Sequence, residues 1–175
     1  RKFEDYVKTN IFDVVGMNSS TFMLPDSEIE SIAEQYRFEG NKLVNIGKHI
    51  SSYKLGSEYA SGGAGGISTV DDYIKFLEGL RNYKLLKKET VELMTTDRLT
   101  EQQKMTYWLA DKHGYGLGVR CSKGDSIYTE FGWGGAAGAY LSLDIESGIS
   151  IYCAMHLLSS PVQEMRSFLY RFIRA

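Results

Sequence analysis

The stretch FGWGGAAGAYLSLDIESGISIYCAM, residues 131–155, decides the fold. After its glycine-rich start, every second residue is apolar over residues 139–145 and again over residues 149–155. Alternation of this kind is typical of β-strands that bury one face. The residues between the two runs, DIESG at 144–148, are a turn signal. The two runs are therefore predicted to pair as an antiparallel hairpin.

Two further extended segments precede this hairpin. Residues 115–121 alternate between apolar or aromatic side chains and glycine or arginine. Residues 127–131 form a second extended run. Together with the hairpin, these segments predict an antiparallel β-sheet.

Helical periodicity occurs on both sides of the predicted sheet in the sequence. It predicts helices over residues 3–16, 27–35, 70–80, 88–95 and 160–173. The third of these follows Ser68, a favourable N-cap, with Asp71 in a capping-box-like position. The last has Ser160 as N-cap and Pro161 in its first turn. An antiparallel β-sheet flanked by helices belongs to the α+β class.

Residues 18–61 show little periodicity apart from the short predicted helix. We expect a long irregular excursion here, of a kind that is usually functional. A glycine-rich run at residues 62–66 ends it and precedes the central helix. A phosphate-binding loop would be followed by a lysine, which is missing, so these glycines are expected to allow close backbone packing.

The composition indicates a globular chain of one-domain size. The chain has 175 residues, of which 43% are hydrophobic, and a net charge of −2, so it can bury a sizeable core. It has no long run of Lys or Arg, and we expect no nucleic acid or anionic membrane as a partner. The chain begins at Arg1 and enters a helical pattern at once. We therefore expect it to be a piece of a longer chain.

The cysteines and histidines predict neither a metal site nor a cofactor. Cys121 and Cys153 are expected to be buried free thiols, with one disulfide between neighbouring strands as the alternative. His49, His113 and His156 are scattered, and none has a partner at metal-ligand spacing.

One Ser-x-x-Lys motif is present, at residues 51–54. In serine acyl-transfer enzymes, a lysine one helical turn after the serine can take its proton. That chemistry needs a firm, buried helix start, whereas Ser51 lies in the irregular excursion. We interpret the motif as a chance match.

Three segments, in order, carry a resemblance to a known family: residues 3–22, 59–76 and 113–140. They resemble the serine β-lactamase-like hydrolases, the penicillin-recognising enzyme family that includes class C β-lactamases and esterases. Residues 3–22 look like the family's "nif.PLGM..T.f" segment, with Val14 and Val15 in place of Pro-Leu. Residues 59–76 are similar to "aGGl.ST..Dyakf", and residues 113–140 resemble "yGlG" followed by "fgH.G…G". The resemblance spans nearly the whole chain and implies the β-lactamase/transpeptidase-like fold.

The resemblance also implies which part of the family lies outside this sequence. The family's catalytic Ser-x-x-Lys and its Tyr-x-Asn both lie upstream of the matching region, and no Tyr-x-Asn occurs in these 175 residues. Residues 1–175 are therefore expected to be the C-terminal portion of a β-lactamase-like domain, without the part that bears the nucleophile.

One family motif falls inside the chain. Trp133, Gly134 and Gly135 occupy the place of the family's Lys-Thr-Gly triplet, which walls the active site. The resemblance implies that these residues bind substrate and that the backbone N–H of Ala136 is an oxyanion-hole donor. A tryptophan offers an apolar wall and one N–H donor, but no charge for a substrate carboxylate. The alternative is that the glycines only begin a tight strand.

The resemblance implies a function for the intact protein. It would be a serine hydrolase acting through an acyl-enzyme on esters, amides, or β-lactam or D-Ala peptide-like substrates, and Trp133 favours an esterase or amidase. Its partner would be a small-molecule acyl substrate, and the isolated chain is expected to be inactive. The alternative is a non-catalytic ligand- or peptidoglycan-binding module of the same fold. A surface left by a missing half also predicts self-association.

Overall fold

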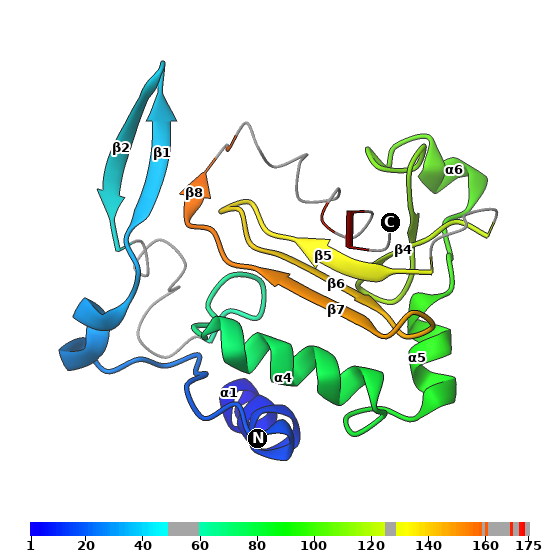
Figure 1. Cartoon of the computed structure of the whole chain (residues 1–175), viewed down its shortest axis with the longest axis horizontal. Helices are drawn as coiled ribbons and strands as arrows, with labels where there is room; N and C mark the ends of the chain where they lie inside the picture. Colours follow the sequence, from blue (N-terminus) through cyan, green and yellow to red (C-terminus); the bar gives the residue numbers. More distant parts are fainter. Residues whose placement is uncertain (49–59, 125–128, 159, 161–168, 170–171, 174–175) are drawn as a thin grey trace.

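The computed structural model describes residues 1–48, 60–124, 129–158, 160, 169, 172 and 173. Within these residues the main β-sheet is antiparallel throughout, with strand order β3-β4-β5-β6-β7. Helices and an antiparallel sheet confirm the α+β class (Figure 1). The strands are β3 (Gly114–Tyr115), β4 (Arg120–Cys121), β5 (Phe131–Gly134), β6 (Tyr140–Asp144) and β7 (Ile149–Cys153).

The hairpin predicted from the alternating runs is confirmed. Strands β6 and β7 pair in antiparallel register from Tyr140 opposite Cys153 to Asp144 opposite Ile149. Gly148 adopts a positive φ of 71° in the connecting turn, which glycine tolerates without steric strain.

The two segments before this hairpin differ from the prediction. Residues 115–121 do not form one strand, because the chain reverses within them: the Gly116 N–H donates to the Val119 carbonyl at 2.9 Å, and Gly118 has a φ of 81°. The result is the short β3–β4 hairpin. The run at 127–131 contributes only Phe131 to β5, which continues to Gly134, while residues 125–128 lie outside the described residues.

The opening helix is confirmed, with an unexpected irregularity. It comprises α1 (Phe3–Val7), the π-helical turn η1 (Lys8–Phe12) and α2 (Asp13–Val15). It ends at Gly16, whose left-handed φ of 76° closes the helix as the sequence predicted.

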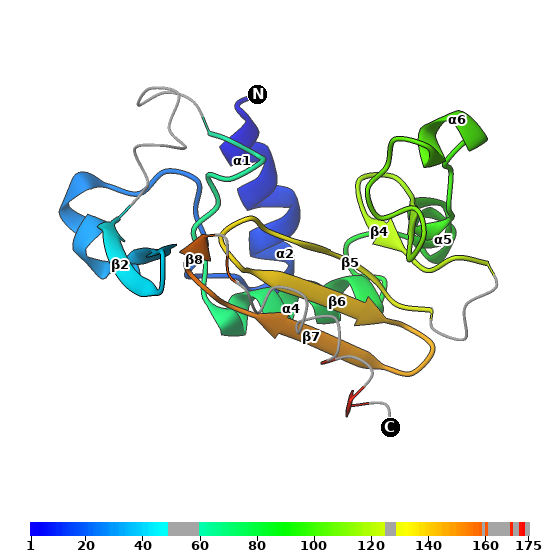
Figure 2. The same ribbon diagram turned by 90° about the horizontal axis from the view of Figure 1, so that it is seen from above.

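The central helix α4 (Val70–Arg81) lies against one face of the main sheet (Figures 1 and 2). Its N-cap is Thr69, not Ser68 as predicted: the Thr69 hydroxyl accepts the Asp72 N–H at 3.2 Å. The Ser68 hydroxyl instead lies 2.6 Å from that of Ser20. Helix α5 (Lys88–Thr95) matches the prediction.

Residues 18–61 contain more regular structure than predicted. A 3₁₀ helix, η2 (Asp26–Ser31), is followed by an antiparallel hairpin of β1 (Gln35–Glu39) and β2 (Lys42–Gly47). Strand β8 (Leu157–Leu158) adds to β1 in parallel. Figure 2 shows this hairpin at the opposite end of the molecule from α5 and α6 (Glu101–Lys104).

The core lies between α4, α5 and the main sheet. Its buried residues come from both layers: Leu77, Leu80, Val91, Cys121, Phe131 and Leu143. No helix in the described part of the chain has both the length and the apolar character needed to cross a bilayer.

Both cysteines are free thiols, as predicted, although only Cys121 is fully buried. Cys121 lies in β4 and Cys153 in β7, three strand spacings apart. That is roughly 14 Å at about 4.8 Å per spacing, well beyond disulfide reach. Burial raises the pKa of the Cys121 thiol to about 11, so it stays protonated at neutral pH.

The C-terminal helix predicted from Ser160 falls largely outside the described residues, as do His49 and the Ser-x-x-Lys motif at 51–54.

Candidate active site

The four residues singled out in the sequence lie together at the end of β5 and in the turn that follows it. Trp133 and Gly134 are the last residues of β5, opposite Leu141 and Tyr140 of β6. The Gly135 N–H then donates to the Ala139 carbonyl at 2.7 Å, and the Gly138 N–H to the Gly135 carbonyl at 3.0 Å. The run therefore ends a strand instead of beginning one.

This end of β5 is open to solvent. Trp133 is 39% exposed, Gly134 and Ala136 are exposed, and Gly135 is half-buried. A Cβ atom at Gly135 would meet nothing closer than Ala139, at 3.7 Å, so the fold itself leaves room there. Small residues and a backbone at the surface let another molecule approach the main chain closely.

Aromatic rings extend from Trp133 across the neighbouring surface. The Tyr115 ring meets the Trp133 ring edge-on at 5.6 Å between centroids. Tyr107 contacts Tyr115 at 5.6 Å, and Trp108 contacts Tyr107 at 6.5 Å. We call these four residues the aromatic row. No pattern in the sequence indicates this row, because its members lie in three separate segments joined only by the tertiary fold.

Two short elements hold the aromatic row in place. Thr100 and Gln103 form a complete capping box on α6, the helix that leads into Tyr107. The Asp97 carboxylate accepts the backbone N–H of Tyr115 at 3.0 Å and so fixes the start of the β3–β4 hairpin. The rings are thus attached to backbone that is itself hydrogen-bonded.

A buried ionic cluster lies beside the same strand. The Arg120 guanidinium donates two hydrogen bonds to the Glu130 carboxylate, at 2.6 and 3.0 Å, and a third to the Tyr140 hydroxyl at 3.1 Å. The Ser142 hydroxyl also donates to Glu130. All four side chains are buried. Gly132 of β5 pairs with both Arg120 and Ser142, so the cluster spans β4, β5 and β6.

The ionic cluster stays charged at neutral pH. Burial alone would raise the pKa of Glu130, but the hydrogen bonds and the charge of Arg120 outweigh it and hold that pKa below its usual value. Burial raises the pKa of the Tyr140 hydroxyl, which therefore remains protonated. The cluster thus joins β4 and β6 to β5, the strand that carries Trp133. Because its carboxylate stays ionised and its phenol protonated, the cluster is unsuited to proton transfer near pH 7.

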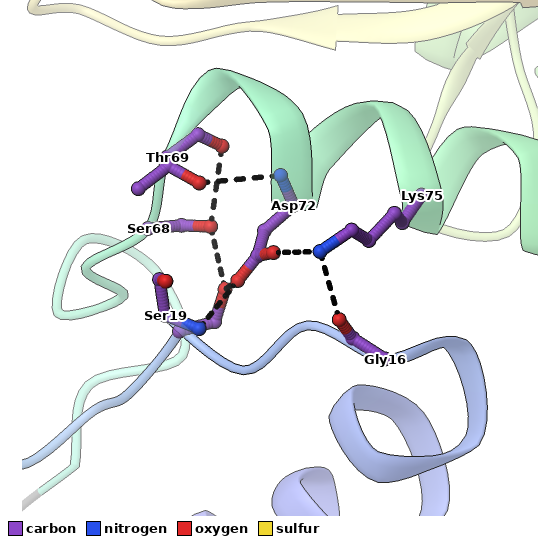
Figure 3. A network of polar contacts seen from close by, with 7 residues as sticks. Gly16, Ser19, Ser68, Thr69, Asp72 and Lys75 are labelled. Atoms are coloured by element: carbon purple, nitrogen blue, oxygen red, sulfur yellow. Dashed lines mark hydrogen bonds and ion pairs between the residues drawn. The ribbon is translucent and has the colours of Figure 1, made fainter.

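A second polar cluster joins the N-terminal segment to α4 (Figure 3). The buried Asp72 carboxylate accepts the Ser19 N–H, the Ser20 hydroxyl and the Lys75 ammonium group, each at 2.8 Å. Lys75 also donates to the Gly16 carbonyl at 2.9 Å. With its partners all within the protein, the cluster fixes the segment after the opening helix and has a structural role.

Replacing Asp72 by alanine is expected to destabilise the protein by about 2–3 kcal/mol, because it leaves three donors without their acceptor. Burial raises the pKa of Asp72, but the hydrogen bonds from Lys75 and Ser20 outweigh it and lower that pKa. The stabilisation is therefore present above the ordinary pKa of 3.8 and is lost as the pH falls through the lowered value. Urea unfolding followed by circular dichroism measures the loss.

The matched control is Asp71→Ala, one residue earlier and exposed, for which a change within about 0.5 kcal/mol is expected. Equal losses from the two variants would contradict a structural role for the Asp72 cluster.

The structure also shows the surroundings of other residues considered in the sequence, the glycine run at residues 62–66 and His156. Cβ atoms at Gly62 and Gly66 would meet the rings of Phe3 and Phe22, at 3.1 and 3.4 Å, so this glycine run serves close packing as predicted. The His156 ring lies 3.1 Å from the Ala33 carbonyl. Among the described residues, no group of three or more His, Cys, Asp or Glu could hold a metal ion.

A hollow of about 500 Å³ lies at the opposite end of β5 and β6. Lys88 and Glu92 of α5, Asp144 and Glu146 are among its lining residues. None of residues 133–136 lines it, so it is separate from the candidate site.

Comparison with known proteins places this geometry in context. The family model described as Beta-lactamase matches residues 1–172. Protein Rv1367c of Mycobacterium tuberculosis is 25% identical over 170 residues, which cover 86% of this chain and 42% of that protein.

Solved structures show the same fold. A simvastatin synthase (LovD) mutant from Aspergillus terreus superposes with a TM-score of 0.78 at 20% identity, over 98% of this chain and 50% of that one. EstCE1, described as a hydrolase with promiscuous acyltransferase activity, gives 0.73 at 18% identity, over 93% and 49%. The chain thus spans about half the length of the proteins it matches.

Proposed function

The chain belongs to the beta-lactamase family, and from that premise we propose that its full-length protein is a serine hydrolase that acts through an acyl-enzyme. By the family resemblance, the nucleophilic serine and its lysine would come from a part of the protein upstream of residues 1–175. This chain would supply one wall of the active site and one oxyanion donor. The isolated chain would then be inactive, because it lacks both nucleophile and base.

The observation that carries the proposal is the end of β5. Residues 133–136 combine a half-exposed indole, two glycines and a turn whose backbone lies at the surface. Ala136 follows in this turn, and the family resemblance makes its backbone N–H the oxyanion donor; a donor that belongs to the backbone needs little reorganisation as charge develops on the substrate oxygen. The ionic cluster of Arg120 and Glu130 would keep the supporting strands rigid.

Trp133 directs the proposal toward esters and amides. A lysine at this position would attract a substrate carboxylate by a charge-assisted hydrogen bond, whereas an indole offers an apolar face and one N–H donor. Substrates without a carboxylate next to the reacting carbonyl therefore fit better than β-lactams. The description of EstCE1 as a hydrolase with acyltransferase activity supports the same reaction class.

Turnover by the full-length protein tests this proposal. We expect hydrolysis of p-nitrophenyl acetate and butyrate, and turnover of a chromogenic cephalosporin well below the ~10⁴ M⁻¹s⁻¹ that is the lower end of ordinary enzyme efficiency. Trp133→Lys should raise kcat/KM for the cephalosporin about tenfold, the worth of one charge-assisted hydrogen bond. Trp133→Phe is the control that keeps an uncharged ring.

Efficient cephalosporin hydrolysis by the unchanged protein would contradict the preference for esters. Turnover of neither substrate class would instead favour a non-catalytic ligand-binding module. Self-association of the isolated chain, through the surface left for the other half, also remains a proposal.

A further inference from the structure

The aromatic row forms an apolar surface that begins at the candidate active site. Trp108 is 80% exposed, and Met105 and Leu117 are also largely exposed. From Trp108 the rings pass through Tyr107 and Tyr115 to Trp133 in consecutive edge-on contacts. Exposed apolar side chains that gather in one region, instead of lying singly, usually mark a binding site.

The inner part of the row is held by packing instead of hydrogen bonding. The Tyr107 hydroxyl is buried and has no hydrogen-bond partner among the described residues. Burial accordingly raises the pKa of this hydroxyl. Since none of the described residues pairs with this hydroxyl, the contacts of the position are those of the ring. Tyr107 therefore contributes a fixed aromatic face between its two neighbours.

We propose that the aromatic row is the subsite for the apolar group of the substrate, and that the full-length protein prefers esters with medium-length aliphatic or aromatic acyl groups. This inference rests on the proposed function and names its substrate class. It follows from continuity: the row ends at Trp133, which directly precedes Gly134, the last residue of β5, and then Gly135. A carbonyl bound at Ala136 would leave its acyl group beside Trp133 and Tyr115.

The chemistry of the row selects the occupant. Ring faces bind aliphatic and aromatic groups by burying apolar area, and each additional buried methylene strengthens binding about fourfold. Indole and phenol rings lose little conformational freedom on binding. An acyl group of several carbons would gain from each ring in turn, whereas an acetyl group would reach only the first.

A chain-length series tests the subsite. For p-nitrophenyl acetate, butyrate, hexanoate and octanoate, kcat/KM of the full-length protein should rise by up to about fourfold per methylene until the row is covered. Tyr115→Ala and Trp108→Ala should lower kcat/KM more for octanoate than for acetate and so flatten this rise. Tyr107→Phe should keep the full rise, because it preserves the ring.

The matched control is Phe38→Ala in the distant β1–β2 hairpin. Phe38 is 39% exposed, the same fraction as Trp133, and its loss should leave the series unchanged. If Tyr115→Ala and Trp108→Ala lower kcat/KM equally for all chain lengths, the rings do not bind the acyl group and the inference is overturned.

A binding measurement separates this inference from the proposed function. Both tryptophans of residues 1–175 lie in the aromatic row, so the part of the protein's tryptophan fluorescence that is lost in Trp108→Phe with Trp133→Phe comes from the row. Unreactive 2-decanone should change that part of the fluorescence at lower concentration than 2-butanone does, and Tyr115→Ala, which keeps both tryptophans, should raise the 2-decanone concentration that is needed. Tighter binding of 2-decanone than of 2-butanone without any ester turnover would support the subsite and contradict the proposed hydrolase. Equal binding of both ketones would contradict the subsite.

Discussion

Replacing Glu130 by alanine is expected to destabilise the protein by about 3–5 kcal/mol, because it leaves the buried Arg120 guanidinium without its counter-ion. Glu130 accepts two hydrogen bonds from Arg120 and one from Ser142. A buried charge that loses its partner retains the full cost of desolvation. The midpoint and slope of urea unfolding, followed by circular dichroism, give the change in free energy.

Two comparisons make this prediction specific. Glu101→Ala breaks the exposed Lys104–Glu101 pair, and a much smaller loss is expected there because solvent screens the two charges. The double variant Arg120→Ala with Glu130→Ala should lose less than the two single losses added together, since it leaves no lone buried charge. Additive losses, or a Glu130→Ala effect as small as that of Glu101→Ala, would contradict the stabilising role of the ionic cluster.

Gly132→Ala is expected to be comparably damaging, for a steric reason. A Cβ atom at Gly132 would lie 2.1 Å from the Leu141 carbonyl oxygen, which belongs to the backbone of β6 and cannot rotate away. Strands β5 and β6 would have to separate beside the ionic cluster. We expect a loss of about 3 kcal/mol, the upper end for overpacking, measured by the same unfolding experiment.

Gly135→Ala is the informative partner of this variant. The space at Gly135 admits a Cβ atom with only an ordinary contact at 3.7 Å, so the free energy of unfolding should change by less than about 1 kcal/mol. In the full-length protein the same methyl group would stand where substrate approaches, and kcat/KM for esters should fall although the fold is intact. Unimpaired ester turnover in Gly135→Ala would remove this residue from the active-site wall.

The parts of the fold that could be predicted are those in which the periodicity of the sequence continues unbroken. The β6–β7 hairpin and helices α4 and α5 each bury one face, so their apolar residues recur at the strand or helix period. The β1–β2 hairpin was missed because its strands are mostly exposed, leaving only Gly40 and Asn41 as a turn signal. The β3–β4 turn was missed because alternation runs straight through Gly118.

The candidate site shows the same division. Residues 133–136 could be proposed from the sequence because they are contiguous and match a family motif in order, and their role in the site stays a prediction. The contact of Tyr115 with Trp133 depends on how the β3–β4 hairpin packs beside β5, which no local pattern encodes. The pairing of Arg120 with Glu130 likewise depends on the register of β4 against β5. Both required the tertiary structure.

The central claim is that a serine outside this chain is acylated beside the Trp133–Ala136 wall. Intact-mass analysis after treatment with a fluorophosphonate, on this chain and on the full-length product of its gene, tests it most directly. One added phosphonyl group on the full-length protein, and none on residues 1–175, is the predicted result. Labelling of residues 1–175 would instead place a reactive serine within this chain, with Ser51 the first candidate, and labelling of neither protein would contradict the hydrolase.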